Sequence, residues 1–251
     1  MNLSIIITYR PAAPIRKKHL DWTVKRYKKM FPTAELIISE DTTGKGWTDF
    51  QKGIYINKGV CFASKENLLI TDIDVVLPKE SILKGLELLE KYSLVTPYSI
   101  LYKLNAGSSK RILSKKPWIA LPKVSLKQQK KQVISKDHPQ GIHMIKRKDF
   151  IKIKGYDERF VGWGSEDSAF QNAAGTLCGS IHRVQGIALH FKHGIVKNRQ
   201  KKRDIGINGY WLPIYKKAYG NVAAMKEILK SRRDLTEDSK KFSGKGEKGV
   251  K

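Results

Sequence analysis

Four short apolar runs constrain the fold of this chain more than any other feature of its sequence. The runs are residues 3–8, 35–39, 67–71 and 94–96. Because apolar residues follow one another without alternation, the runs are typical of strands buried on both faces of a parallel sheet. The intervening segments that we expect to be helical are residues 17–30, 52–64 and 78–92. This β-α-β-α-β order predicts an α/β fold in which a mostly parallel sheet is flanked by helices.

Acidic residues stand where these strands are predicted to end. Asp41 follows the second run, and Asp72 and Asp74 follow the third. Ligands of such sheets bind beyond the carboxyl ends of the strands, and side chains two positions apart on a strand point to the same side. Asp72 and Asp74 therefore suit a divalent cation with oxygen ligands, Mn²⁺ or Mg²⁺, which would neutralise a diphosphate leaving group. The alternative is a strand-end turn with solvated acids, which the acid at the neighbouring strand end disfavours.

A run of aromatic, glycine and acidic residues, 160–167, is the second feature that points to chemistry. Its glycines allow the backbone to approach a ligand closely, and Trp163 can stack on the face of a sugar. Glu166 and Asp167 open a predicted helix, so one alternative is that they only stabilise its N-terminus. We favour the interpretation that one of them is a general base that deprotonates an acceptor hydroxyl.

Two histidines add candidate nitrogen ligands. His190 and His193 lie at the end of a predicted late strand, residues 187–191. Neutral imidazole is a common ligand of a borderline metal such as Mn²⁺. Either ring could instead be an ordinary polar group at a strand end, and the metal interpretation depends on the carboxylates upstream.

The chain is strongly basic, and its charge is unevenly distributed. The formal net charge is +26 over 251 residues. Residues 103–154 carry a net +13 and residues 197–251 a net +10, whereas residues 155–196, which contain the glycine-rich acidic run, carry a net −1. Such a charge points to an anionic partner. Because the two basic segments lie on either side of this run in the sequence, we expect the anionic partner to bind beside the candidate site.

Cysteine content and hydropathy exclude several classes of protein. Two cysteines, Cys61 and Cys178, provide neither a disulfide framework nor a paired metal motif, so we expect reduced thiols in a cytoplasmic protein. The sequence contains no apolar run near the roughly 20 residues of a membrane span.

Taken in order, these motifs resemble the nucleotide-sugar glycosyltransferases of the GT-A fold, of the large family 2 type with a beta-galactosyltransferase-like C-terminal region. The residues that carry the resemblance are 4–10 and 37–41 (nucleotide-binding strands), 69–74 (the metal-binding DxD strand), 152–167 (the GWGGED stretch) and 190–193 (the HxxH strand). The resemblance extends over roughly residues 3–194.

The resemblance implies a single GT-A (Rossmann-like) catalytic domain, a nucleotide-sugar donor of the UDP type, Mn²⁺ or Mg²⁺, and inversion at the anomeric carbon. The residues that it assigns to the metal are Asp74, Asp72, His190 and His193. Those that it assigns to the donor are Thr8, Tyr9, Arg10, Asp41, Asp72 and Trp163. Asp167 would be the base, and Glu166 would bind donor or acceptor hydroxyls. Ser165 replaces a usual glycine and Ser168 a frequent third acid, but neither change removes a catalytic group.

We expect residues 1–196 to form the catalytic domain, with a basic acceptor-side insertion at 103–140. Residues 197–238 would be a basic helical extension, and residues 239–251 a disordered tail rich in lysine and glycine. The pattern is weak over residues 102–136, where Trp118 looks exposed, so we expect a loop or a loosely ordered subdomain there. The residues expected to contact the acceptor are Trp118, Lys115, Lys116, Lys130 and Lys131.

The basic segments favour a polyanionic acceptor, because lysines at this density, with aromatic residues available to stack, suit a phosphate backbone. The leading hypothesis is DNA with hydroxymethyl-modified bases, as in phage-type DNA glucosylation, with the acceptor base flipped into the site. A rival is a peripheral enzyme that sits on anionic lipid and builds a bacterial surface polysaccharide. Both imply the cytoplasm of a bacterium or a phage-infected host. Two further alternatives are a non-catalytic nucleic-acid-binding module on a transferase fold and a merely solvated basic surface.

Overall fold

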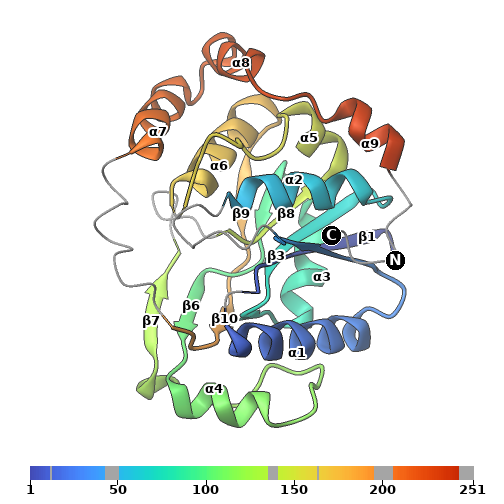
Figure 1. The fold of residues 1–251 in the computed structure, drawn as a ribbon, viewed down its shortest axis with the longest axis vertical. Coiled ribbons are helices and arrows are strands. Elements are labelled where there is room, and N and C mark those ends of the chain that lie inside the picture. The colour runs from blue at the N-terminus through green and yellow to red at the C-terminus, as the bar shows by residue number, and fades with distance from the viewer. Residues whose placement is uncertain (12, 43–50, 135–140, 163, 195–205, 243–251) are drawn as a thin grey trace.

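A six-stranded sheet forms the centre of the fold in the computed structural model, which describes residues 1–11, 13–42, 51–134, 141–162, 164–194 and 206–242 (Figure 1). The order of its strands is β2 (Glu35–Glu40), β1 (Leu3–Tyr9), β3 (Asn67–Asp72), β8 (His143–Lys146), β5 (Leu94–Thr96) and β9 (Ile181–Arg183). The expected apolar runs are therefore strands. β1 pairs in parallel with both β2 and β3, and Thr8 stands opposite Asp72.

One strand departs from the expected parallel order. β8 lies between β3 and β5 and is antiparallel to both. β8 thus separates two strands that are consecutive in the predicted order. The sheet remains mixed, with parallel pairs on either side of β8.

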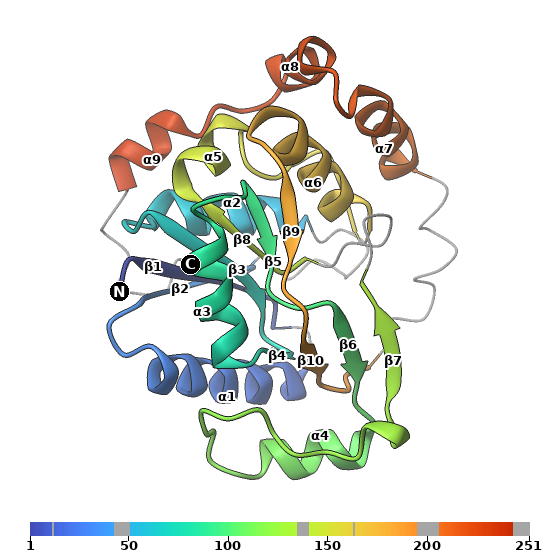
Figure 2. The same ribbon diagram turned by 180° about the vertical axis from the view of Figure 1, so that it is seen from behind.

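Helices cover both faces of the sheet, as Figures 1 and 2 show from opposite sides. The helices on one face are α1 (Pro14–Met30) and α3 (Lys79–Leu88), and those on the other are α2 (Lys52–Phe62), α5 (Arg147–Lys152) and α6 (Glu166–Leu177). Alternate residues of β1 pack on opposite faces of the sheet. Ile6 lies in one apolar cluster, and Ile5 and Ile7 lie in the other. This alternation confirms the expectation of an α/β fold with helices on the sheet.

A four-stranded sheet extends the fold beside the strand ends (Figure 2). Its order is β4 (Val75–Val76), β10 (Ile187–His190), β6 (Ile100–Lys103) and β7 (Lys130–Val133). The segment expected to be a loop or a loosely ordered subdomain, 102–136, was predicted wrongly in its described part. It contains α4 (Ala106–Leu113), a short 3-10 helix (Leu126–Gln128) and the edge strand β7, which has the backbone of β6 as its partner. Residues 135–140 lie outside the described residues.

The C-terminal part is helical and packs against α5 and α6. Its helices are α7 (Ile207–Ala218), α8 (Val222–Lys230) and α9 (Thr236–Phe242). Gly220, with φ of +80°, lies between α7 and α8, where one continuous helical region was expected. Tyr215, Met225 and Leu235 lie in the same apolar cluster as residues of α5 and α6. α9 includes four residues expected to be disordered, 239–242, and the remainder of that segment lies outside the described residues.

Within the described residues, the helices lack the combination of length and apolar character that crossing a membrane requires.

Candidate active site

Asp74, His190 and His193 come together at the junction of the two sheets. Each offers one ligand atom, and the three atoms lie within 4.8 Å of one another. Nε2 of His190 is 3.7 Å from Oδ1 of Asp74, and Nε2 of His193 is 3.5 Å from Oδ2. The backbone fixes this approach, because β10 pairs with β4 and Phe191 donates its N–H to the Asp74 carbonyl at 2.8 Å. A carboxylate with two imidazoles is a donor set suited to Mn²⁺.

The charges around Asp74 keep these groups in the protonation states that bind metals. Burial alone would raise the pKa of Asp74, but His190, Arg16 and His193 hold it below its ordinary value. Arg16, in the first turn of α1, donates from Nη1 to Oδ2 of Asp74. Burial lowers the pKa of His190, although Asp74 opposes the shift. Asp74 is therefore ionised and His190 neutral near neutral pH, the forms that metal binding requires.

Asp72 lies outside this cluster in the structure. Its Oδ1 is 2.8 Å from Nζ of Lys52, the first residue of α2. The two acids expected to share a cation thus face different partners: Asp74 faces the histidines and Asp72 faces a lysine.

Glu166 and Asp167 form the first turn of α6, as expected. The chain enters this helix through left-handed backbone at Gly162, Gly164 and Ser165, with φ of +76°, +106° and +79°. Left-handed backbone favours glycine, so Ser165 stands at a position where the resemblance expects a glycine. The tight entry buries Glu166, which is 7% exposed, and leaves Asp167 partly buried beside it.

The environment of Asp167 suits a proton acceptor. Burial and the neighbouring Glu166 carboxylate raise the pKa of Asp167 to about 8, and Lys52 opposes this rise. Burial also raises the pKa of Glu166. The hydroxyl of Tyr156 donates to Oδ1 of Asp167 at 3.4 Å. A carboxyl group with a pKa near the working pH is well matched to general-base catalysis.

Gly141 leaves room where Lys52 and Asp167 approach each other. A Cβ atom at residue 141 would lie 2.5 Å from Nζ of Lys52, and 2.9 and 3.1 Å from the two carboxylate oxygens of Asp167. Lys52, Tyr156 and Gly141 were not singled out from the sequence. Lysine is so abundant in this chain that Lys52 gave no local signal, and Gly141 has meaning only through its neighbours in space.

The residues expected to bind the donor lie at the ends of β1 and β2. Nε of Arg10 is 3.2 Å from Oδ2 of Asp41, and the Tyr55 hydroxyl donates to Oδ1 of Asp41 at 2.7 Å. Asp41 donates its own N–H to the carbonyl of Tyr9 at 2.7 Å. Thr8, Tyr9, Arg10 and Asp41 therefore share one edge of the sheet with Asp72. Trp163 lies outside the described residues.

Trp118 is not the exposed aromatic that the sequence suggested. Its ring is half-buried and meets Trp22 of α1 edge-on, with centroids 6.3 Å apart. Arg26 of α1 donates to the backbone carbonyls of Trp118 and Ala120. The tryptophan thus fastens the segment after α4 to α1, because an apolar ring gains more from packing there than from exposure to water.

The lysines expected to contact the acceptor lie in two separate places. Lys115 and Lys116 follow α4, and Lys130 and Lys131 lie on the edge strand β7. All four are exposed.

Comparison with known proteins identifies the same kind of enzyme. Residues 122–194 match a family model described as the N-terminal domain of galactosyltransferase. No curated protein matches the chain. The family match covers β8, the glycine-rich loop, α6 and β10, and hence Asp167, His190 and His193.

Three solved structures are similar to this chain. The catalytic domain of Drosophila beta1,4galactosyltransferase 7 in complex with xylobiose is 17% identical, with a TM-score of 0.47 over 92% of this chain and 80% of that chain. A mutant of that enzyme in complex with manganese, UDP-Gal and xylobiose is 18% identical, with a TM-score of 0.43 over the same shares. Staphylococcus aureus TarS (residues 1–349) is 12% identical, with a TM-score of 0.52 over 76% of this chain and 60% of that chain. These findings confirm the expected fold, the expected resemblance and the expected class of enzyme.

Proposed function

We propose that this GT-A glycosyltransferase moves a sugar from a nucleotide sugar, of the UDP type, to a hydroxyl of an acceptor, with Mn²⁺ or Mg²⁺ held by Asp74, His190 and His193. The observation that carries the proposal is the convergence of these three ligand atoms beside a sheet edge that also presents Arg10, Asp41 and Asp72. When bound, the cation would neutralise charge on the diphosphate leaving group.

In the proposed reaction, Asp167 takes the proton of the acceptor hydroxyl. The acceptor oxygen forms a bond to the anomeric carbon, and the bond from that carbon to the diphosphate oxygen breaks with its electron pair leaving on the diphosphate. Attack from the face opposite the leaving group inverts the anomeric configuration. Support comes from the partly buried position of Asp167 and from its pKa, which desolvation and Glu166 raise to about 8.

For the acceptor we propose DNA that carries hydroxymethyl-modified bases. The support is the position of the basic residues. The exposed lysines and arginine of the segment after β6 are Lys110, Arg111, Lys115, Lys116, Lys123, Lys127, Lys130 and Lys131. Two backbone contacts join this segment to the metal-ligand strand: Lys192 donates its N–H to Oγ of Ser109, and Leu104 donates its N–H to the His190 carbonyl, each at 2.8 Å. A phosphate backbone bound there would run past the site.

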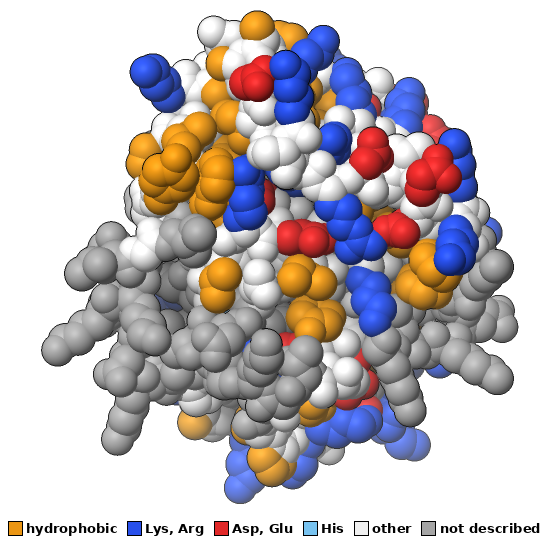
Figure 3. All heavy atoms as spheres, turned by 45° about the horizontal axis from the view of Figure 1, so that its top comes forward, with side chains coloured by type: hydrophobic (Ala, Val, Ile, Leu, Met, Phe, Trp, Pro, Cys, Tyr) orange, Lys and Arg blue, Asp and Glu red, His pale blue; other side chains and the backbone are white. Residues whose placement is uncertain are grey.

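The alternative acceptor is a lipid-linked saccharide on an anionic membrane surface, and one observation favours it. Hydrophobic side chains gather over α7 on the face shown in Figure 3. Tyr210 is 64% exposed and Val222 is 47% exposed, and Lys216 and Lys217 are exposed beside them. Aromatic and basic side chains together suit a headgroup region. A non-catalytic nucleic-acid-binding role is disfavoured, because burying Asp74 and Glu166, which are 4% and 7% exposed, would be costly without a catalytic purpose.

Donor turnover tests the proposed function. A panel of UDP-sugars is incubated with Mn²⁺, and UDP release is compared between the wild type and Asp167→Asn. We expect metal-dependent release by the wild type and a loss of at least about 100-fold in the variant. Absence of metal-dependent turnover by a wild type that still binds DNA tightly would reject the enzymatic function.

Labelled donor distinguishes the acceptors. The donor is offered with hydroxymethylated DNA and, in parallel, with lipid-linked saccharide on anionic vesicles. We expect label in the DNA, and DNA binding that weakens steeply as salt rises. Label in the lipid fraction alone would replace DNA by the membrane-bound acceptor.

A further inference from the structure

Asn208, in the first turn of α7, makes three hydrogen bonds to the loop that precedes α6. Its Oδ1 accepts from the N–H of Val161 at 2.9 Å. Its Nδ2 donates to the carbonyl of Val161 at 2.9 Å and to the carbonyl of Gly164 at 3.0 Å. The side chain is 7% exposed. One amide therefore holds the backbone on both sides of the glycine-rich turn.

The loop depends on these bonds because it is not part of a helix or a strand. Within the described residues, backbone hydrogen bonds hold its two ends: Phe160 donates to Asp157 and Ala169 donates to Ser165. Between these points, Asn208 supplies the bonds at Val161 and Gly164. The left-handed glycines make this stretch intrinsically adaptable, so an external amide is what selects one conformation.

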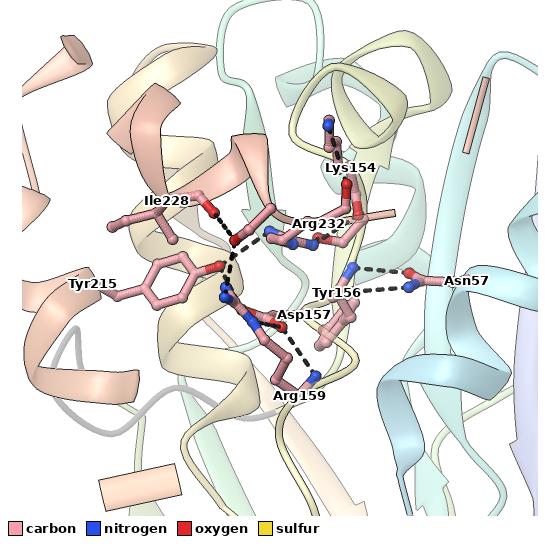
Figure 4. Close-up of polar contacts among 10 residues, drawn as sticks. Asn57, Lys154, Tyr156, Asp157, Arg159, Tyr215, Ile228 and Arg232 are labelled. Carbon is pink, nitrogen blue, oxygen red and sulfur yellow. Dashed lines mark hydrogen bonds and ion pairs between the residues drawn. The ribbon is translucent and has the colours of Figure 1, made fainter. Parts of the chain in front are cut away.

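The segment before the loop is held by the same C-terminal region, through Tyr215 of α7 and Arg232 between α8 and α9 (Figure 4). The Tyr215 hydroxyl donates to Oδ2 of Asp157 at 2.8 Å. Arg232 donates to the carbonyls of Lys154 and Gly155, each at 2.7 Å, and to the Tyr215 hydroxyl at 3.1 Å. These contacts fix residues 154–157, and Asn208 is the point where α7 fixes the loop just before the carboxylates.

We propose that Asn208 is a positioning residue for the carboxylates of Glu166 and Asp167. By holding Val161 and Gly164 it sets where α6 begins, and thus where both carboxylates stand. The inference rests on the proposed function in one respect, that Asp167 is the base. Within the described part of the chain, the side-chain hydrogen bonds of Asn208 go to Val161 and Gly164, which are neither proposed metal ligands nor proposed donor residues.

Replacement by alanine tests this role, with Asn221→Ala as the matched control. Asn221 belongs to the same C-terminal region and caps α8 by accepting from the N–H of Ala224. We expect Asn208→Ala to lower kcat about 10- to 100-fold, because small misplacements of reacting groups cost that much. The donor KM should change less than about threefold, because most of the proposed donor residues lie on or just after β1, β2 and β3 rather than in this loop. Asn221→Ala should keep the wild-type kcat, although it loses a helix cap.

Amide hydrogen exchange tests whether Asn208 holds the loop before α6, and it does so independently of turnover. Amide exchange in the peptide that contains residues 158–170 should be faster in Asn208→Ala, with Val161 the most affected, and unchanged in Asn221→Ala. Should Asn208→Ala not fold, Asn208→Asp takes its place, since it keeps the oxygen that accepts from Val161 and lacks the two donated bonds. Wild-type exchange in the folded variant, or a kcat within twofold of wild type, would overturn the inference. Absence of wild-type turnover would instead reject the proposed function and leave the exchange result to decide the positioning.

Discussion

The ammonium of Lys52 lies 2.8 Å from Oδ1 of Asp72, and the space at Gly141 brings the same ammonium toward the carboxylate of Asp167. Asp72 ends a strand of the proposed donor side, and Asp167 is the proposed base. A single cation at the start of α2 thus counters acids on both sides of the candidate site. Burial alone would lower the pKa of Lys52, but Asp72, Asp167 and Glu166 raise it above its ordinary value, so Lys52 remains charged.

Replacing Lys52 by methionine should move the rising limb of the pH–rate profile to higher pH. Lys52 lowers the pKa of Asp167, so its removal allows that pKa to rise further. Each unit of upward shift reduces the ionised fraction of the base at pH 7 about tenfold. Lys52→Arg should restore most of the wild-type profile, and Lys84→Met, at an exposed position, should leave it unchanged. A Lys52→Met profile that coincides with the wild-type profile would contradict this role.

Alanine at Gly141 should reduce activity without preventing folding. The new Cβ would meet the flexible end of Lys52 at 2.5 Å. The lysine can swing away, at the expense of its position between Asp72 and Asp167, and we expect kcat to fall about tenfold or more. Gly107→Ala in α4 is the control, since the nearest atom to its Cβ is 3.7 Å away. Equal rates for the two variants would show that the space at Gly141 is not needed.

The wild-type rate should rise with pH toward about 8. The proposed base works only when ionised, and the pKa of Asp167 is about 8. Measuring kcat/KM between pH 6 and 9 with Mn²⁺ and saturating acceptor should therefore show a rising limb with a midpoint near that value. A rate that is flat across this range would remove Asp167 as the titrating base.

Asp167→Asn should be more stable than the wild type at high pH, although inactive. The folded protein keeps the Asp167 proton to about pH 8, whereas the unfolded chain loses it near the ordinary value of 3.8. Between these values the folded state binds more protons, so the free energy of unfolding falls as pH rises. The variant lacks the carboxyl group that causes this fall in the free energy of unfolding. Its Tm at pH 8 should therefore exceed that of the wild type by at least about 2–4 °C, the shift that a difference of about 1 kcal/mol in the free energy of unfolding produces. The two melting temperatures should converge near pH 4, and a lower Tm of the variant at pH 8 would contradict the account.

The parts of the fold that the sequence predicted are those that local pattern determines. The apolar runs became β1, β2 and β3 to within one or two residues, because a continuous apolar strand must be covered on both faces. The place of β8 was not predictable in this way. Its own pattern indicates a strand, but its antiparallel insertion between β3 and β5 depends on pairing across the chain.

The residues of the candidate site differ in the same way: a local sequence pattern predicts some of them, and only the tertiary fold reveals the others. Asp74, His190 and Asp167 have motif-like neighbours and are therefore predicted from the sequence, whereas the contacts of Lys52 and Asn208 are not encoded by any sequence spacing. Trp118 was misjudged because its basic surroundings suggested exposure. Trp22, which its ring contacts, lies on α1, far away in the sequence, and only the tertiary fold brings the two rings together.

The most direct test of the account is UDP release from a UDP-sugar as a function of Mn²⁺ concentration, in the wild type and in Asp74→Asn. Asp74 contributes the carboxylate of the three-residue cluster. We predict saturable, Mn²⁺-dependent release by the wild type that EDTA abolishes. For Asp74→Asn, folded as judged by its Tm, the Mn²⁺ requirement should rise at least about 100-fold, more than loss of a residue that only supports a ligand would cost. Equal Mn²⁺ dependence of the two proteins, or turnover that EDTA does not affect, would contradict the proposal that Asp74 and the two histidines hold the catalytic metal.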